Sequence, residues 1–475
     1  MTVMTRRDLA LLSLAATAVA ASPSLSLAAE NWRLGFKTPP KTLDSELKLI
    51  EGRLPAGLQG NFYRVGPAQF ERAGERLGHW FDGDGMMQRF AIAGGRVHHR
   101  GRFVDTPKRR EEEAAGRFLY SGFGFAPKSP ADIRNPDTVN AANTAVLPID
   151  GEVWALWEGG SPYRIDPQSL ETRGRKVFER PLDGVAFSAH PKRGSDGDVW
   201  NFGLLGGSFV IWHLAPDASV RKAKLVELPE ASLMHDFAVT SKHIILLLPP
   251  MNRSKSNAST LVDHYTWQPD KPLIALVLDK DTLTIQRRYE LPARFLFHIG
   301  NAWEDEAGTI RLDAFLETDA TFATKTARDL ALVQTYAAPT ARLNVITLPV
   351  DGRATMEALP GSGEFPRIDQ RLVGRKHRYT YGVIANGVAR WDLATGKQET
   401  FSYGPNTWSE EPVFTPRPDA TDETGGWLTA TALNYGAGRT ELAVFDARRL
   451  SDGPIARLAC PYALPLGFHG AFVTA

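Results

Sequence analysis

Short apolar segments recur along the chain after residue 30, and turn-forming residues separate them. Examples are GEVWALWEGG, SFVIWHLA, HIILLLPP, LIALVLD and GWLTATALNYGAGRTELAVFDA. Val, Ile, Leu, Trp and Tyr are frequent within them, and Gly, Asp, Asn or Pro bound them, a pattern typical of β-strands. The segment VIANGVARWDLATGKQETF holds two closely spaced hairpin turns, at Asn386-Gly387 and Thr395-Gly396. The pattern predicts an all-β protein.

Helical patterns are scarce, and only residues 323–337, ATKTARDLALVQTYA, suggest a helix. An all-β chain of 475 residues with regular strand spacing is typical of a β-propeller or a large barrel. The sequence has no strict repeat of the kelch or WD type, and no interdomain linker interrupts the pattern. We therefore expect one large closed β-architecture over residues 29–475.

Residues 1–28 have the composition of an export signal. Arg6 and Arg7 precede an apolar stretch from Leu9 to Ala21, and SLA at residues 26–28 offers a cleavage site. The paired arginines favour the twin-arginine type, which exports folded and often cofactor-loaded proteins, so we expect a periplasmic protein. The stretch is short for a membrane span. The alternative is an uncleaved helix that tethers the chain to the membrane.

Charge and cysteine content exclude several classes of function. The 55 basic and 54 acidic residues give a net charge of +1, which argues against nucleic acid or an acidic substrate as the main partner. The chain has one cysteine, Cys460, so it forms no intrachain disulfide and no cysteine-based metal site.

The segment FDGDGM, which contains Asp82 and Asp84, has the spacing of a calcium loop. An EF-type loop needs a ligand at position five and a glutamate at position twelve, where this chain has Met86 and Ala93. The residues that follow alternate as in a strand. We therefore interpret the segment as a tight turn that enters a strand, with its carboxylates accepting backbone N–H bonds.

Four of the eleven histidines share a context in which apolar residues lead into a strand or turn: His190, His235, His298 and His469. Their separations of 45, 63 and 171 residues place no two of them on one helix. They would meet only if the fold brings separate strands to one point, as the inner strands of a propeller do. Taken singly, each is also compatible with a structural histidine.

The other histidines have less informative surroundings. His213 and His243 lie in apolar strands and suit the edge of the core. Polar or charged neighbours favour a surface or loop position for five others, namely His79, His98, His99, His264 and His377.

Ten segments in a fixed order carry a resemblance to a known family: FYRVGPAQF, HWFDGDGMM, NAANT, LWEGGSPYRID, AHPK, MHDFAVT, FHIGNAWE, EFPRID, EEPVFTPRP and GFHGAF. From about residue 45 to the C-terminus the chain resembles the carotenoid cleavage oxygenases. The resemblance implies a seven-bladed β-propeller with a loop and helical cap over a non-haem Fe(II) on the axis. It makes His190, His235, His298 and His469 the iron ligands. The FDGDGM segment marks the family but holds no metal.

The resemblance also implies roles for residues around the iron. Glu158, Glu364 and Glu411 would each accept the second ring N–H of a ligand histidine, which orients the imidazole. By family order, His190 would be the histidine without a carboxylate partner. Thr144 would lie near an open coordination position and shape it with its methyl group. Glu410, beside Glu411, suits an ordinary surface position.

The implied activity is O₂-dependent cleavage of a conjugated C=C bond to give aldehydes. Stilbene-cleaving members carry a lysine where this chain has Trp157, and an apolar ring suits a polyene, so the resemblance favours a carotenoid or apocarotenoid substrate. The alternatives are a lignostilbene- or stilbene-cleaving dioxygenase and a non-catalytic periplasmic propeller that binds a carotenoid. We further expect a monomer that takes up its polyene through peripheral contact with a membrane.

Overall fold

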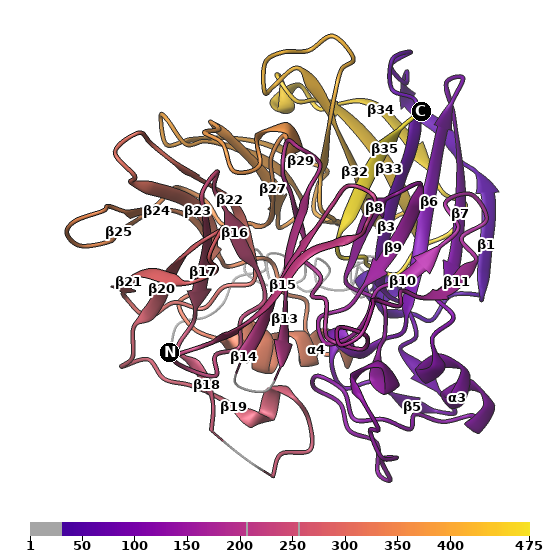
Figure 1. The fold of residues 1–475 in the computed structure, drawn as a ribbon. Coiled ribbons are helices and arrows are strands. Elements are labelled where there is room, and N and C mark those ends of the chain that lie inside the picture. The colour runs from indigo at the N-terminus through magenta and orange to yellow at the C-terminus, as the bar shows by residue number, and fades with distance from the viewer. Residues whose placement is uncertain (1–30, 206–207, 255–256) are drawn as a thin grey trace, which may run out of the picture.

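Seven antiparallel β-sheets stand around a central axis (Figure 1). The computed structural model describes residues 31–205, 208–254 and 257–475. Innermost strands of several neighbouring sheets contact one another around the axis. The seven-bladed all-β propeller expected from the sequence is thereby confirmed. The export signal predicted for residues 1–28 lies outside the described residues.

In six sheets one strand lies innermost and the others follow it outward from the axis, and in the seventh two short strands share the innermost place. The first sheet contains β35 (Gly470–Thr474), β3 (Gly60–Pro67), β6 (Gly85–Ala93), β7 (Arg96–Phe103) and β1 (Thr42–Glu46). The second contains β8 (Ala145–Ile149), β9 (Glu152–Leu156), β10 (Tyr163–Ile165) and β11 (Thr172–Arg175). The third contains β12 (Lys192–Arg193), β13 (Val199–Leu205), β14 (Ser208–Leu214) and β15 (Val220–Glu227). The fourth contains β16 (Phe237–Val239), β17 (His243–Leu248), β20 (Leu273–Asp279) and β21 (Ile285–Leu291).

The remaining three sheets follow the same pattern. The fifth contains β22 (Ile299–Glu304), β23 (Ile310–Leu316), β24 (Arg342–Leu348) and β25 (Thr355–Ala358). The sixth contains β26 (Glu364–Arg367), β27 (Tyr379–Ile384), β28 (Gly387–Asp392) and β29 (Lys397–Ser402). In the seventh, β30 (Thr407–Ser409) and β31 (Val413–Pro416) both pair with β32 (Gly426–Asn434), followed by β33 (Arg439–Asp446), β34 (Pro454–Ala459) and β2 (Lys48–Gly52).

Strands from both ends of the chain close the ring. In the first sheet, β3 pairs with β35 in antiparallel register from Gly60↔Thr474 to Arg64↔Gly470, and Figure 1 shows the two strands side by side. In the seventh sheet, β2 pairs with β34. Segments near the N-terminus thus complete the two sheets that also contain the C-terminal strands, which joins the ends of the chain.

The core lies between neighbouring sheets, and β17 shows why. Its sequence HIILLL is a continuous apolar run because both of its faces are buried. Ile245 and Leu247 pack toward the fifth sheet, and Ile244 and Leu246 pack toward the third. Successive side chains of a strand point to opposite faces, so this one strand packs against the sheets on both of its sides.

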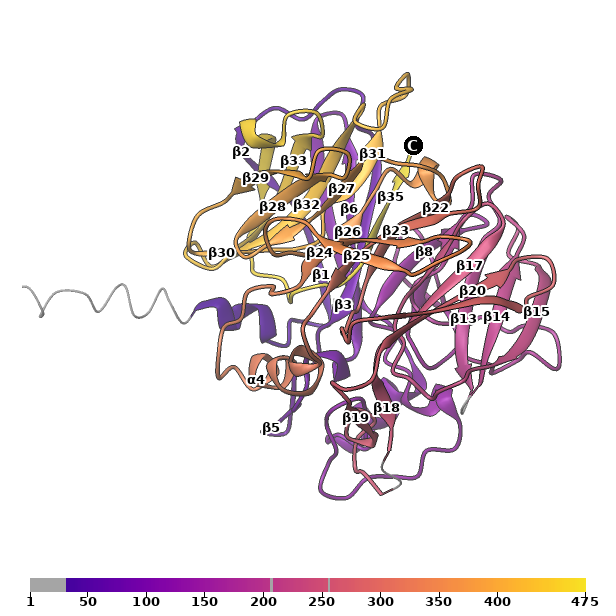
Figure 2. The ribbon, with the colours of Figure 1, turned by 90° about the vertical axis from the view of Figure 1, so that its left-hand side faces the viewer.

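Loops and short elements cover one side of the propeller (Figure 2). They include the hairpins β4 (Glu71–Arg72)–β5 (Glu75–Arg76) and β18 (Met251–Arg253)–β19 (Tyr265–Trp267). The described residues as a whole contain the helices α3 (Pro107–Ala115) and α4 (Ala327–Ala331), the π-helix η5 (Phe322–Thr326), and the 3₁₀ turns η1 (Asn31–Phe36), η2 (Trp80–Asp82), η3 (Pro136–Val139), η4 (Val262–His264), η6 (Gln370–Leu372) and η7 (Leu450–Asp452). The helix suggested for residues 323–337 therefore ends at residue 331. Within the described ranges, no helix has both the length and the apolar character needed to cross a membrane.

The FDGDGM segment is a turn that enters β6, as predicted. Asp82 ends η2 and accepts backbone N–H bonds from Phe123 and Gly124, in the cap. Asp84 differs from the prediction, because its main partner is the ammonium group of Lys108 at 2.8 Å. Burial raises the pKa of Asp82 to about 6, although the backbone N–H bonds oppose the shift. The segment fixes the cap to the propeller.

Candidate metal centre

One position recurs in all seven sheets and faces the axis. It lies at the first residue of the innermost strand or within two residues before it. Going round the ring from the first sheet, the occupants are His469, Thr144, His190, His235, His298, Glu364 and Glu411. The fold thus brings together seven residues that are spread over more than 300 positions of the sequence. All but one of the predicted site residues occupy this position, and the exception is Glu158.

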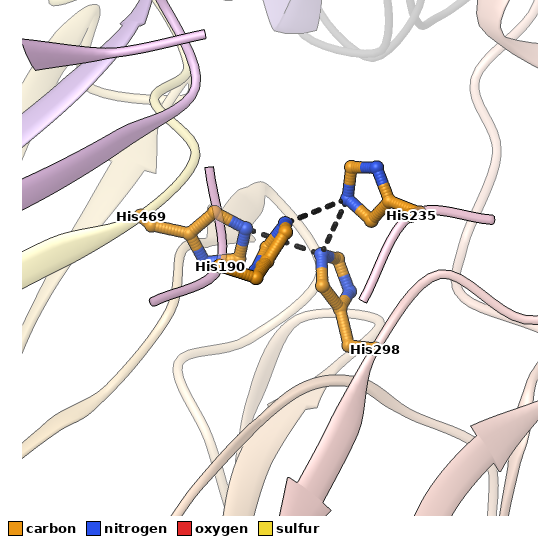
Figure 3. A group of neighbouring side chains, drawn as sticks. All are labelled: His190, His235, His298 and His469. Carbon is orange, nitrogen blue, oxygen red and sulfur yellow. Dashed lines mark hydrogen bonds between the residues drawn. The ribbon is translucent and has the colours of Figure 1, made fainter. Parts of the chain in front are cut away.

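The four predicted histidines converge on one point (Figure 3). The Nε2 atoms of His190 and His235 are 2.9 Å apart, those of His235 and His298 are 3.3 Å apart, and those of His298 and His469 are 3.1 Å apart. All four candidate ligand atoms lie within 4.8 Å of one another. His190, His298 and His469 are buried, and His235 is nearly so.

These distances fit a divalent metal ion. Two nitrogens at right angles around an ion at about 2.1 Å are about 3.0 Å apart, close to the separations between neighbouring rings in this cluster. Four imidazole lone pairs that face one point repel each other unless a cation lies between them. A donor set made only of imidazoles suits iron among other transition metals. The four side chains therefore fit a metal ion held by four nitrogens.

Carboxylates orient two of the four rings. His298 Nδ1 donates to Glu364 Oε2 at 2.6 Å, and His469 Nδ1 donates to Glu411 Oε1 at 2.8 Å. Both contacts fix the tautomer in which the Nε2 lone pair faces the common point. The backbone N–H of Gly470 donates to Glu411 Oε2 at 2.8 Å, which holds this carboxylate on both oxygens.

Glu158 departs from the prediction. Its Oε1 atom is 3.2 Å from His235 Nδ1, but the two groups are not aligned for a hydrogen bond, and Oε1 has no hydrogen-bond partner. The reason is its position: Glu158 lies in the turn after β9 and not on an innermost strand. The same Oε1 atom is 3.8 Å from His190 Nε2. Among the described residues, no carboxylate accepts a hydrogen bond from His190.

The electrostatics of the site differ between its members. Burial, together with the neighbouring imidazoles, lowers the pKa values of His190 and His235 well below the usual value, which keeps both rings neutral. Burial also lowers the pKa of His298, but Glu364 outweighs it and the net shift is upward. Burial raises the pKa of Glu411, yet Arg367 and His469 bring it down to about 2. Burial and Asp236 raise the pKa of Glu158 well above its usual value.

A cavity of about 780 Å³ opens beside the four histidines. Its lining is mostly apolar and includes His235, His298 and His469. Trp157 and Thr144 also line it, as the sequence led us to expect. The hydroxyl of Thr144 donates to Asn143 Oδ1 at 2.9 Å, so it is already engaged within the protein. The volume is typical of a site that encloses a small organic molecule.

Two aromatic residues of the site were not predicted. Phe365 has φ of 56°, a left-handed conformation that is rare for a bulky residue. Its ring stacks on His298 with centroids 5.1 Å apart and meets His469 edge-on at 5.3 Å. Phe297 meets His235 edge-on at 5.1 Å. Their places beside Glu364 and His298 in the sequence were the available signal.

Two arginines support the ring of site residues from behind. Arg64, on β3, is 2% exposed and donates to the backbone carbonyls of Phe468 and Glu411. Phe468 directly precedes His469, and the side chain of Glu411 accepts a hydrogen bond from it. Arg367, on β26, donates to the carbonyl of Gly470 and lies 3.6 Å from Glu411 Oε1. Arg64 appears in the segment FYRVGPAQF, but only the closed ring reveals its partners.

Several polar residues that were expected at the surface or in loops are buried. His79 and His99 are fully buried, and His377 is 6% exposed. His79 and His377 lie in loops, as expected, whereas the burial of the three rings was not expected, because partners distant in sequence satisfy them. The Nε2–H of His79 donates to Ala323 O, His99 lies between Gln88 and Tyr462, and His377 contacts Asp313. Glu410 is also buried and accepts the backbone N–H of Gly467.

Known proteins share both this sequence and this fold. The family described as "Retinal pigment epithelial membrane protein" matches residues 36–474. The apocarotenoid-15,15'-oxygenase of Synechocystis sp. is 30% identical over 95% of this chain and 98% of its own length. The resveratrol cleavage oxygenase 1 of Aspergillus fumigatus is 28% identical over 92% and 94%. A crystal structure of cobalt-substituted Synechocystis apocarotenoid oxygenase superposes with a TM-score of 0.86 at 28% identity, over 94% of this chain and 99% of that one. The chain therefore belongs to the carotenoid cleavage oxygenase family and is an iron-dependent oxygenase.

Proposed function

We propose that this protein cleaves a conjugated C=C bond of a carotenoid or apocarotenoid with O₂ and releases aldehydes. One observation carries the proposal: three of the four imidazoles that fit one metal ion line a large, mostly apolar cavity. A polyene has few polar groups, so an apolar wall matches it along most of its length. The similarity to an apocarotenoid oxygenase over nearly the whole chain supports this substrate class.

We assign the iron to His190, His235, His298 and His469. When bound there, Fe(II) supplies the redox chemistry that activates O₂. Glu364 and Glu411 hold two of the rings in the tautomer whose lone pair faces the iron. The carboxyl group of Glu158 lies beside His235 without a hydrogen bond to it. Thr144 shapes the space next to the site, and its hydroxyl stays directed to Asn143.

The residues of the cavity wall exclude water and position the substrate. Phe297 and Phe365 lie against the ligand rings and line the cavity, so they exclude water and keep the polyene beside the site. Trp157 adds an apolar surface where a phenol-binding lysine would otherwise lie. Excluding water protects the reacting double bond from side reactions.

A stilbene is the second candidate substrate. The similarity to a resveratrol cleavage oxygenase supports it, because that relative covers nearly as much of the chain as the apocarotenoid oxygenase does. Trp157 disfavours it, since an indole ring offers a phenol only one N–H and no charge.

The setting of the enzyme rests on three further proposals. The paired arginines Arg6 and Arg7 support twin-arginine export to the periplasm, with residues 1–28 as the signal.

Ile133 and Leu261 line the cavity and are also 50% and 45% exposed, so they mark its mouth. An apolar mouth supports peripheral contact with a membrane, from which the polyene enters. We further propose that the protein acts as a monomer.

The test is a product analysis with iron-loaded protein. A panel of carotenoids, apocarotenals and resveratrol is incubated with the protein and O₂. Polyene bleaching is followed by absorbance, and the aldehydes are identified by mass spectrometry. We expect aldehydes from a carotenoid or apocarotenal, and neither bound iron nor product from His298→Ala. His213→Ala is the matched control, because His213 pairs with Asp198 away from the metal site. Products from resveratrol alone would favour the second candidate, and no product from any compound would contradict both.

A further inference from the structure

Six residues with a carboxyl group line the cavity, and one of them, Glu317, contacts none of the metal ligands. Glu317 directly follows β23 and lines the cavity together with Phe295, Phe322, Pro339 and Ile384. Both of its carboxylate oxygens accept from the hydroxyl of Thr340, at 3.0 and 2.9 Å. Among the described residues, no lysine or arginine forms an ion pair with it. A partly desolvated carboxyl without a counter-charge is costly, which makes it a candidate for binding.

The backbone places this carboxyl on the same wall as the metal ligands. Glu317 and Phe295 form an antiparallel bridge and exchange both backbone hydrogen bonds, at 2.8 and 3.1 Å. Directly opposed residues of such a pair point their side chains to the same face. Phe295 packs on Phe297 with centroids 5.0 Å apart, and Phe297 packs on His235. The wall therefore runs from the metal centre over two phenylalanines to Glu317.

The length of this wall sets the distance to the metal. Phe295 precedes the ligand His298 by three residues, and three extended residues span at most about 10 Å. Glu317 therefore lies on the wall beside the metal centre, and it contacts none of the four histidines in the structure. Its electrostatic neighbours are Glu364 and Asp319, both negative, and burial together with these charges raises its pKa to about 7.

We propose that Glu317 binds a hydroxyl group at the end of the substrate and so sets how far the chain enters the cavity. A hydroxyl suits this carboxyl because it donates to the ionised form and accepts from the protonated form. A carbonyl group accepts from the protonated form alone. The hydroxyl of Thr340 and the backbone N–H of Ala341 occupy part of the acceptor capacity of this carboxyl, and the rest is available to a substrate hydroxyl. The inference deepens the proposed function and rests on it, since it takes an elongated apolar molecule as the ligand.

Two apocarotenals test the inference, one with a hydroxyl on its terminal ring and one without it. Dissociation constants are measured by quenching of tryptophan fluorescence, and kcat/KM is measured by polyene bleaching. Wild-type protein should prefer the hydroxylated compound roughly 10-fold in both, as expected for a hydrogen bond to a charged group. Glu317→Leu should abolish the preference, and Glu317→Gln should retain a smaller one. Asp319→Asn is the matched control, because it removes a charge two residues away, outside the cavity lining, and should keep the preference.

The outcomes separate this inference from the proposed function. Equal binding of both compounds by wild-type protein, or an unchanged preference in Glu317→Leu, would overturn the inference. If Glu317→Leu does not fold, the loss or retention of preference in Glu317→Gln decides. A hydroxyl preference in binding without any cleavage would leave the inference standing and contradict the proposed function. Cleavage without a hydroxyl preference would support the proposed function and overturn the inference.

Discussion

At the scale of single residues, two adjacent glutamates show how one step along the chain changes the role of a carboxylate. Glu411 contacts the ring of His469 and the backbone of Gly470. Glu410 turns away, accepts the N–H of Gly467 and lies 3.9 Å from Arg64. Both are buried, so burial alone does not distinguish them. Only Glu411 contacts a predicted metal ligand.

Changing Glu411 to Gln should weaken iron retention and turnover by roughly 10- to 100-fold, as is typical for the loss of a carboxylate behind a metal-bound histidine. The amide keeps one acceptor oxygen, whereas both His469 Nδ1 and Gly470 N need one. Metal content by mass spectrometry and kcat under saturating Fe(II) would measure the effect. Glu410→Gln is the control, because its amide oxygen still accepts from Gly467. Equal iron content and turnover in both variants would contradict the assigned role.

Trp157→Lys should lower kcat/KM for the best apocarotenal by roughly 10-fold, because it places an ammonium group in the apolar wall at a desolvation cost. It should not create stilbene cleavage, since recognition of a phenol needs further partners. Trp157→Phe keeps an apolar ring and should stay near wild type. If the lysine variant has unchanged kinetics on the apocarotenal, Trp157 does not contact the substrate.

At the scale of elements, the turn before β6 determines where the cap sits. Asp82 accepts the backbone N–H groups of Phe123 and Gly124, and Gly122 and Phe123 line the cavity. Asn143 donates to the carbonyls of Phe81 and Gly83 from the other side. The turn thus holds part of the cavity wall, which explains what an acidic segment does without a metal.

Asp82→Ala should loosen this part of the cap while the sheets stay intact. Loss of an ionised acceptor typically corresponds to about 1.5–3 kcal/mol per hydrogen bond. The amides of Phe123 and Gly124 should therefore exchange hydrogen at least roughly 10-fold faster, as measured by mass spectrometry on peptides from residues 118–125. Asp44→Ala, which removes a half-exposed carboxylate paired with Arg100, should leave the exchange of this segment unchanged. Unchanged exchange in Asp82→Ala would show that the cap does not depend on this turn.

At the scale of the whole molecule, the metal centre depends on closure of the ring. His469 precedes β35, and β35 pairs with β3 near the opposite end of the chain. Arg64, on β3, binds the carbonyls of Phe468 and Glu411 across the same junction. The last ligand is therefore held in place by strands from both ends of the sequence.

Deleting residues 470–475 should lower the thermal midpoint by several degrees and reduce bound iron, although all four histidines remain. The deletion removes the five paired positions between β35 and β3 and the N–H that holds Glu411. Calorimetry and metal analysis on the same samples would measure both effects. Removing Ala475 alone should change neither. A stable truncated protein with full iron would show that the ring closes without β35.

The sequence by itself determined the strands, the family and the identity of the four histidines. Strand patterns are local, so HIILLL reads as a strand buried on both faces without knowledge of its neighbours. Ten ordered segments pointed to the right family. In contrast, burial of His79, His99, His377 and Glu410 depends on partners distant in sequence, so the polar neighbours of these residues did not predict it.

Only the tertiary structure decided how the site residues meet. Seven equivalent positions, one for each sheet, become neighbours because the ring closes, and no local pattern encodes that closure. Glu158 stands one strand farther out, which is why it approaches His235 without a hydrogen bond. The left-handed turn at Phe365 and the shared wall of Phe295 and Glu317 likewise follow from backbone geometry. The physical reason is common to all of them: the side-chain types are set residue by residue, whereas distances and alignments exist only once distant strands have packed together.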